Sequence, residues 1–485
     1  MSPKVAIGLL GGYLGLLWVV AWWFRREDSA ESYFVGRRQS PWWAVAFGMI
    51  GTTLSGITFV SVPGWVRDTQ WTYYVMVLGY LPGYWLIARI LIPLYYRLGS
   101  PSIYSFLESF AGPFTRKVGA FFFLASRTVG ASLRLFLASA VLYLFVGQAW
   151  GISIEVMALL TLFIIWIYTF RSGIRVVVWT DVIQTVFLLI ALGGSVAFLW
   201  NAIGEGAATW ELLYQSGYTK IWDWDWHSPR FSIKLFLAGM FIALVMTGLD
   251  QDMMQKNLSC RSTADSQRNV RAFSVMLAAV NIVFLLLGSL LLLYAKRLGI
   301  MLPEHSDDIF PLIARDHMPL ALGMLFFVGL VAAALSSADS AITALTTSFI
   351  NDFLPQRWQQ RRRRYSVQAA FSGVLLILVA ILVRLPNEAV ISRLFTWAGY
   401  TYGPLLGLFA YGILSKQRPI PDRLAASLAL MTPLVTWAIQ WASQRWWGYS
   451  WGFELLFIAG MLLMGMLWLL RKKDTIEVGE IRLRR

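Results

Sequence analysis

Long apolar runs, separated by short polar or charged segments, recur along the whole chain of 485 residues. A helix needs about 20 predominantly apolar residues to cross the hydrocarbon core of a bilayer, and about thirteen runs approach that length. We expect spanning helices near residues 5–24, 42–66, 73–96, 118–148, 151–170, 179–202, 232–255, 272–295, 320–350, 365–383, 394–415, 424–444 and 451–470. The pattern therefore predicts an all-α polytopic membrane protein whose two termini face opposite sides of the bilayer.

The composition and the charges support this prediction. The chain is 58% hydrophobic and 14% charged, which is more apolar than a single soluble core of this length requires. Its net charge of +15 would suit nucleic-acid binding, but the basic residues, including the run 361–364, stand at the ends of apolar runs. With the N-terminus outside, 27 of the 41 Lys and Arg residues fall in inner segments and 10 in outer ones, as the positive-inside rule requires. We predict an outer N-terminus, a cytoplasmic C-terminus, contacts between the basic run and lipid headgroups, and no nucleic-acid partner.

The second apolar run is interrupted by residues that weaken a helix. Residues 51–59 read Gly-Thr-Thr-Leu-Ser-Gly-Ile-Thr-Phe, and Pro63 and Gly64 follow. Glycines and hydroxyl residues at mid-membrane depth predict a broken helix, whose freed backbone carbonyls can bind a cation. Close packing of small residues between helices is the alternative interpretation.

The ninth run also carries polar residues inside the membrane. Ser336, Asp339 and Ser340 stand at positions i, i+3 and i+4 and therefore share one face of a helix. Hard oxygen donors of this kind suit a small alkali cation, and an intramembrane aspartate is costly enough to indicate function. The alternative is that the serines hydrogen-bond to carbonyls of their own helix.

Three other acidic residues lie near the ends of spans. Asp181, just inside the sixth span, can form an ion pair with Arg175 or take part in a cation site. Asp250 and Asp252 end the seventh span, where they form either part of an inner gate or a solvated helix cap.

Two arginines, Arg127 and Arg134, lie seven residues apart within the fourth span. Guanidinium groups at that depth need partners. Either they pair with acidic side chains of the bundle, or one of them faces a cavity and binds an anionic solute.

Four segments, taken together, resemble the sodium:solute symporter family, which carries sugars, proline, pantothenate, iodide and sialic acid. The likeness runs from about Ser32 to Lys416. It is carried by residues 173–184, which look like the family block Gly-x-x-x-Val-x-Trp-Thr-Asp-x-x-Gln, by Ser336 and Ser337 on an Ala/Ser-rich helix, by residues 250–268 with Gln255 and the basic residue next to it, and by residues 306–319 in an outer loop.

The resemblance implies a leucine-transporter-like core of two inverted five-helix repeats. The corresponding divisions are residues 1–41 with an extra helix, 42–202 with the first repeat, 203–415 with an outer loop and the second repeat, and 416–485 with two further helices and a basic tail. A bacterial member of the family would lie in the inner membrane.

The resemblance also implies the site residues. A sodium site would use backbone carbonyls of Gly51, Leu54 and Ala333 and the hydroxyls of Ser336 and Ser337. A second sodium site of some members would match Asp181, Ser336, Asp339 and Ser340, but Asp339 stands where such members often have serine, so one and two sodium ions per cycle both remain open. Substrate-binding candidates are Thr53, Ser55 and Thr58, which look like the hydroxyl set of the sialic acid branch, together with Arg127 and Arg134.

The function that follows is sodium-coupled import of a small polar organic solute by alternating access. The solute is expected to be anionic or polyhydroxylated, of the sialic acid, sugar or carboxylate type. The alternatives are a proton-coupled symporter, or a channel or sensor on the same fold. An enzyme is not expected, because His227, His305 and His317 lie in outer loops and the spans hold no metal-binding or nucleophile motif. No cofactor is expected beyond sodium as the coupling ion.

Overall fold

The computed structural model describes residues 3–24, 30–169, 173–204, 206–355, 361–384, 390–449, 451–452 and 454–470. These residues form helices and connecting loops, with one isolated β-bridge between Ser40 and Cys260. Among the described residues eight helices are long and apolar enough to cross a membrane, or up to ten if each bent pair counts as one span. The all-α membrane fold is confirmed, whereas thirteen crossings remain a prediction.

Every apolar run that predicts a span coincides with a helix or a group of consecutive helices. In chain order these are α1 (Pro3–Phe24), α3 (Trp42–Thr53) with α4 (Gly56–Thr69), α5 (Tyr73–Leu86) with η2 (Ile87–Leu91) and α6 (Ile92–Leu98), α8 (Pro113–Leu142) with η3 (Tyr143–Gly147) and α9 (Gln148–Trp150), α10 (Ile154–Thr169), α11 (Ile174–Ile203), α13 (Ser232–Met246) with α14 (Gln251–Leu258), α15 (Thr263–Leu298), α17 (Leu320–Phe353), α18 (Arg361–Leu382), α19 (Val390–Leu414), α20 (Asp422–Trp447) and α21 (Glu454–Leu469). The short elements between them are α2 (Ala30–Val35), η1 (Gly36–Arg38), α7 (Ser105–Glu108), α12 (Ala207–Gln215), η4 (Ser306–Asp308) and α16 (Ile309–Asp316).

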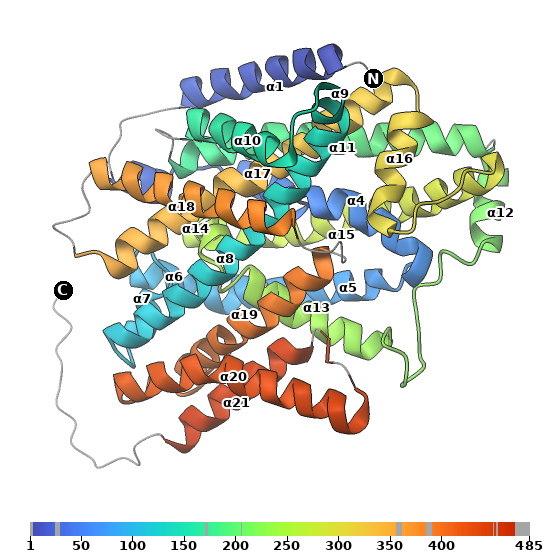
Figure 1. Ribbon diagram of the computed structural model, residues 1–485. Coiled ribbons are helices and arrows are strands. Elements are labelled where there is room, and N and C mark those ends of the chain that lie inside the picture. Colours follow the sequence, from blue (N-terminus) through green and yellow to red (C-terminus); the bar gives the residue numbers. More distant parts are fainter. Residues whose placement is uncertain are drawn as a thin grey trace.

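The helices outside the predicted repeats flank the bundle. In Figure 1, α1 lies along one side, and α20 and α21 lie along the opposite side. Helix α1 packs on α11 and α17, and α20 and α21 pack on α19. The loop helices α12 and α16 lie at one end of the bundle, opposite the end that holds α6 and α7 (Figure 1).

Two helices are broken, and each break follows from its sequence. The axes of Trp42–Thr53 and Thr58–Thr69 differ by 58°, and the axes of α13 and α14 differ by 66°. At the first break Leu54 leaves the helical conformation (φ −81°, ψ 65°), and at the second Asp250 is extended and caps α14 through bonds to the amides of Asp252 and Met253. The predicted break in the second run is confirmed. Interrupted helices in both halves of a transporter chain are typical of a central binding site.

Small residues also bring helices into close contact. Close packing between helices, the alternative interpretation of the glycines in the second apolar run, therefore holds as well. A Cβ atom added to Gly51 would lie 2.4 Å from Thr185 Oγ1 of α11. A Cβ atom added to Gly79 of α5 would lie 2.0 Å from the Phe236 carbonyl oxygen of α13. Without these glycines the backbones would have to separate.

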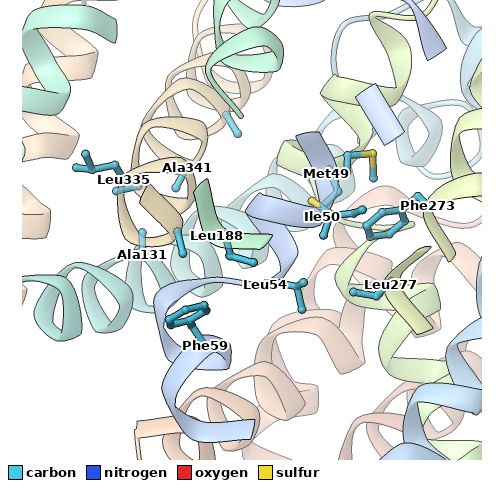
Figure 2. Close-up of a cluster of buried hydrophobic side chains, with 14 of the residues drawn as sticks. Met49, Ile50, Leu54, Phe59, Ala131, Leu188, Phe273, Leu277, Leu335 and Ala341 are labelled. Carbon is cyan, nitrogen blue, oxygen red and sulfur yellow. The ribbon is translucent and has the colours of Figure 1, made fainter. Parts of the chain in front are cut away.

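The hydrophobic core surrounds the first break. Figure 2 shows Ile50, Leu54 and Phe59 on either side of it, with Phe273 and Leu277 of α15 nearby. These side chains are all buried. The break is therefore enclosed by tightly packed apolar residues, which fixes where its polar groups point.

One prediction about the basic run 361–364 is wrong for Arg364. Its side chain is buried, and its guanidinium carbon lies 4.9 Å from the centroid of the Tyr33 ring. Arg364 therefore makes a cation–π contact inside the protein rather than a contact with lipid headgroups.

Candidate ion and solute sites

The half-helix α14 is polar but wholly buried: each of its eight residues, Gln251–Leu258, is buried. Its amide side chains bond to three neighbouring segments. Gln255 Nε2 donates to the Phe34 carbonyl at 2.8 Å and to Thr347 Oγ1 at 3.0 Å, and the Gln251 side chain bonds to the backbone of residues 101 and 103. A buried polar network of this kind fixes one arrangement of the elements that it joins.

Lys256, in the last turn of α14, points into the space between α3, α11 and α17. Its Nζ atom donates to Asp181 Oδ2 at 2.6 Å and to Thr52 Oγ1 at 2.5 Å, and its side chain is 1% exposed. The other Asp181 oxygen accepts from Ser336 Oγ at 2.5 Å. The predicted ion pair between Asp181 and Arg175 is therefore wrong. Arg175 Nη1 instead lies 3.4 Å from Gln39 Oε1.

The five predicted ligands of the first sodium site come from two elements that meet. Gly51 and Leu54 lie at the end of α3, and Ala333, Ser336 and Ser337 lie on α17. Ser337 Oγ lies 3.3 Å from the Thr52 carbonyl oxygen and 3.2 Å from the Ala333 carbonyl oxygen.

The chemistry of these groups fits a sodium ion. The end of α3 leaves its last carbonyls without donors from its own helix, and the hydroxyls of Ser336 and Ser337 face that end. Carbonyl and hydroxyl oxygens are hard donors of the kind that alkali cations prefer. The Ser337 bond to Ala333 shows that back-bonding within α17 also occurs.

The four residues of the predicted second site divide between two contacts. Asp181 and Ser336 are hydrogen-bonded, whereas Ser340 bonds to Asp252 of α14. Asp339 is buried on the same helix face. Tyr13 of α1 is also buried, and its ring packs edge-on against Phe187 of α11. Because α1 packs on both α11 and α17, a helix outside the predicted repeats contacts the helices that carry this cluster.

Arg127 pairs with the acidic end of α14. Its guanidinium forms an ion pair with Asp252 and lies 3.8 Å from Asp250 Oδ2, which accepts from Tyr402 Oη at 2.5 Å. Asp250 and Asp252 are buried, so the interpretation of these residues as a solvated cap is wrong. Helix α14 is thus joined to α8 by one ion pair and to α11 by another of opposite polarity.

A cavity of about 140 Å³ opens beside the break between α3 and α4. All five predicted substrate-binding residues line it: Thr53, Ser55, Thr58, Arg127 and Arg134. Tyr84, Tyr402 and Asn281 add polar groups to the wall, and side chains such as Met253 and Leu277 make the rest apolar. An apolar cavity with a few convergent polar groups is typical of a small-molecule site.

Arg134 differs from Arg127 in its partners. Among the residues that the structure describes, Arg134 makes no ion pair, and neither its Nε atom nor Asn281 Oδ1 has a hydrogen-bond partner. Buried polar groups are normally satisfied. Both arginines therefore line the cavity, but Arg127 also pairs with acidic residues, whereas Arg134 makes no ion pair among the described residues.

Residues 33–414 match the model of the sodium:solute symporter family. The chain belongs to the sodium:solute symporter family. Two bacterial members of the family illustrate the likeness. The sodium/sialic acid symporter SiaT of Proteus mirabilis is 27% identical over 84% of this chain and 84% of its own length. The sodium/sialic acid symporter NanT of Aliivibrio fischeri is 27% identical over 84% of this chain and 82% of its own length.

A solved structure shows the same fold. It is described as the substrate-bound outward-open state of a Na+-coupled sialic acid symporter with a novel Na+ site, and it matches with a TM-score of 0.81. The match covers 95% of this chain and 96% of that chain at 23% identity. The structure of MhsT in complex with L-phenylalanine matches with a TM-score of 0.51 over 89% of this chain and 99% of that chain, at 16% identity.

Five residues near these sites were not predicted from the sequence as site residues. They are Tyr13, Thr52 and Lys256 near Asp181, and Asn281 and Tyr402 at the cavity. Lys256 was noted as the basic residue next to Gln255 in a segment that resembles the family. Its spacing of four residues from Asp252 gave a signal, since i and i+4 positions share a helix face. No local pattern points to Tyr13 or Tyr402, which reach the clusters from distant helices.

Proposed function

We propose that this chain is a sodium-coupled symporter that imports a small anionic solute by alternating access, as its sialic acid symporter relatives suggest by their names. The observation that carries the proposal is the Arg134 guanidinium, which faces a cavity lined by the hydroxyls of Thr53, Ser55 and Thr58. A partly buried cation that makes no ion pair among the described residues is suited to a carboxylate. The hydroxyls are suited to the polar remainder of a polyhydroxylated solute.

The broken helix offers a physical basis for coupling. The end of α3 contributes the Gly51 and Leu54 carbonyls to the proposed sodium site and the Thr53 and Ser55 side chains to the solute cavity. A cation that orders this end also orders the cavity wall, so each ligand should strengthen the binding of the other. The proposed sodium ligands are Gly51, Leu54, Ala333, Ser336 and Ser337.

The proposed architecture has two inverted repeats, residues 42–202 and 203–415, each opened by a broken helix. Residues 1–41 and 416–485 lie outside the repeats. The proposed location is a bacterial inner membrane, with the N-terminus outside and the C-terminus in the cytoplasm.

Sodium-gradient uptake into proteoliposomes tests the proposed function. A tenfold sodium gradient supplies about 1.4 kcal/mol per ion, and a potential of about 100 mV supplies about 2.3 kcal/mol per charge moved. One sodium ion carried with a monoanion moves no net charge, so we expect about tenfold accumulation of N-acetylneuraminate, driven by the gradient alone. A neutral solute carried with one sodium ion would also use the potential. Equal uptake with choline in place of sodium would contradict sodium coupling, and sodium-independent equilibration without accumulation would indicate a channel.

The same assay tests the ion site through Ser336→Ala and Ser337→Ala. Each change removes one oxygen donor, so the apparent sodium affinity should fall by about tenfold, whereas solute affinity at saturating sodium should change less. Ser337→Ala is the cleaner variant, because Ser336 also bonds to Asp181. Ser139→Ala is a matched control, since among the described residues the hydroxyl of this buried serine bonds back to Leu135 of its own helix and to no other group. Unaltered sodium dependence in both variants would remove these serines from the site.

Cysteine labelling tests the proposed orientation. The native Cys260 is buried, so a Cys260→Ser background leaves introduced thiols as the targets of a membrane-impermeant maleimide. Tyr214→Cys, at a position 84% exposed in α12, should be labelled in intact cells. Arg261→Cys, exposed in the loop before α15, should be labelled only after permeabilisation. The reverse pattern would invert the orientation.

A further inference from the structure

We propose that Lys256 is a tethered cation that takes the place of a second sodium ion, so that this symporter binds one sodium ion per cycle. The inference rests on the proposed sodium-coupled function. It concerns the residues that match a second sodium site in some family members. If Lys256 supplies the positive charge at that position, one sodium ion per cycle is expected rather than two.

The ammonium group already occupies Asp181, the carboxylate among the predicted second-site residues that is hydrogen-bonded to Ser336. Lys256 Nζ lies 2.6 Å from Asp181 Oδ2, and the other Asp181 oxygen accepts from Ser336. Thr52, whose hydroxyl is 2.5 Å from Nζ and 3.3 Å from Ser336 Oγ, completes this group of oxygens. A sodium ion bound at Asp181 as well would lie beside the ammonium and be repelled by it.

Lys256 is held in this position by its helix. Gln255, the residue before it, bonds to Phe34 and Thr347, and Asn257, the residue after it, accepts from Asn269 Nδ2 at 2.6 Å. Asp252, one turn earlier, is paired with Arg127. These bonds fix the backbone of α14 beside Asp181, and the ammonium is covalently attached to that backbone, so it does not exchange with ions from solution as a free cation would.

The ammonium of Lys256 is also sufficient to compensate the charge of Asp181. Asp181 and Lys256 are both wholly buried, and a buried charge is stable only when it is compensated nearby. One ammonium compensates one carboxylate, so Asp181 attracts no further cation. The first proposed sodium site lies next to this pair and shares Ser336 with it. Its other proposed ligands, the backbone carbonyls and the Ser337 hydroxyl, are not among the hydrogen-bond partners of the ammonium in the described part of the chain.

Counting bound sodium tests the inference without any solute. The number of ²²Na+ ions bound per purified protein at saturation should be one in the wild type. Lys256→Gln removes the tethered charge but keeps a side chain of similar length, and this variant should bind two sodium ions. Lys256→Arg keeps the charge and should bind one. The double variant Asp181→Asn with Lys256→Gln removes both charges and should also bind one. Lys296→Gln, at an exposed position at the end of α15, is the control for loss of a lysine.

The outcomes separate the inference from the proposed function. Two sodium ions per wild-type protein would overturn the inference and leave sodium coupling intact, and so would a single ion in a folded Lys256→Gln variant. If that variant does not fold, the wild-type count still decides. No sodium binding to the wild type would instead overturn the proposed function.

Transport gives an independent readout of the same number. One sodium ion with one N-acetylneuraminate anion carries no net charge, so wild-type uptake at a fixed sodium gradient should not respond to an imposed membrane potential. Two sodium ions with the same anion carry one net charge, so uptake by Lys256→Gln should rise when the interior is made negative. Voltage-dependent wild-type uptake of this anion would contradict a single sodium ion.

Discussion

Removing one partner of the Arg127–Asp252 pair is expected to destabilise the protein severely. Both side chains are at least nine-tenths buried. Asp252→Ala therefore leaves the Arg127 guanidinium without its main counter-charge, and Arg127→Ala leaves the Asp252 carboxylate without its own. Breaking a buried pair in this way costs about 3–5 kcal/mol. Each single variant should therefore show a large fall in melting temperature in detergent and little sodium-driven uptake.

A double-mutant cycle distinguishes this pair from two independent contacts. Arg127→Gln combined with Asp252→Asn removes both charges, and we expect it to be more stable than the sum of the two single changes by about 1–3 kcal/mol. Asp225→Asn is the control, because the Asp225 side chain is 65% exposed in the loop between α12 and α13. Additive effects in the cycle would mean that the two charges do not depend on each other. Asp250, whose carboxylate lies 3.8 Å from Arg127, should retain part of the interaction in Asp252→Asn.

Buried ion pairs hold both ends of α14 to neighbouring helices. Its acidic end is joined to α8 through Arg127, and its basic end is joined to α11 through Asp181. Alternating access requires one group of helices to move against another. Any movement of α14 relative to α8 and α11 must break or carry these pairs, so they set part of the free energy between the transporter's states.

The fold was largely predictable because the membrane imposes its own pattern. Each apolar run of about 20 residues had to be helical, since the hydrocarbon core offers no other partner for backbone groups. The break after Thr53 was also readable, because glycines and hydroxyls cluster there. The end of the seventh span was not: residues 250–258 are polar enough to suggest a solvated helix end, yet α14 is buried.

The residues of the site could be predicted at the helix break. The prediction failed for the ion pairs that join residues far apart in the sequence. The hydroxyl residues at positions 53, 55 and 58, which were chosen by their resemblance to the sialic acid branch of the family, line one cavity. Of the two interpretations of Asp181, the ion pair with Arg175, six residues away in the chain, is wrong, and the observed partner is 75 residues away on another helix. Sequence proximity favours local pairs, but the bundle decides which distant charges meet.

Replacing Arg134 is expected to abolish selectivity for anionic solutes. Its guanidinium faces the cavity and makes no ion pair among the described residues, so its charge is available to a solute carboxylate. A charge-assisted hydrogen bond contributes about 1.5–3 kcal/mol, which corresponds to a loss in affinity of roughly 10-fold to 150-fold. Arg134→Gln should therefore weaken N-acetylneuraminate binding by this factor.

The comparison that isolates the charge uses a neutral analogue. The methyl ester of N-acetylneuraminate keeps the hydroxyls that Thr53, Ser55 and Thr58 are proposed to bind but lacks the carboxylate. Its affinity should be weak in the wild type and nearly unchanged in Arg134→Gln, while Arg134→Lys should bind the anion with intermediate affinity, because a lysine cannot form the bidentate contact. Competition against labelled anion at saturating sodium measures all three. If Arg134→Gln weakened the ester and the anion equally, the arginine would shape the cavity without binding the carboxylate, and Arg127, which keeps its own acidic partners, would be left as the other cation at the cavity wall.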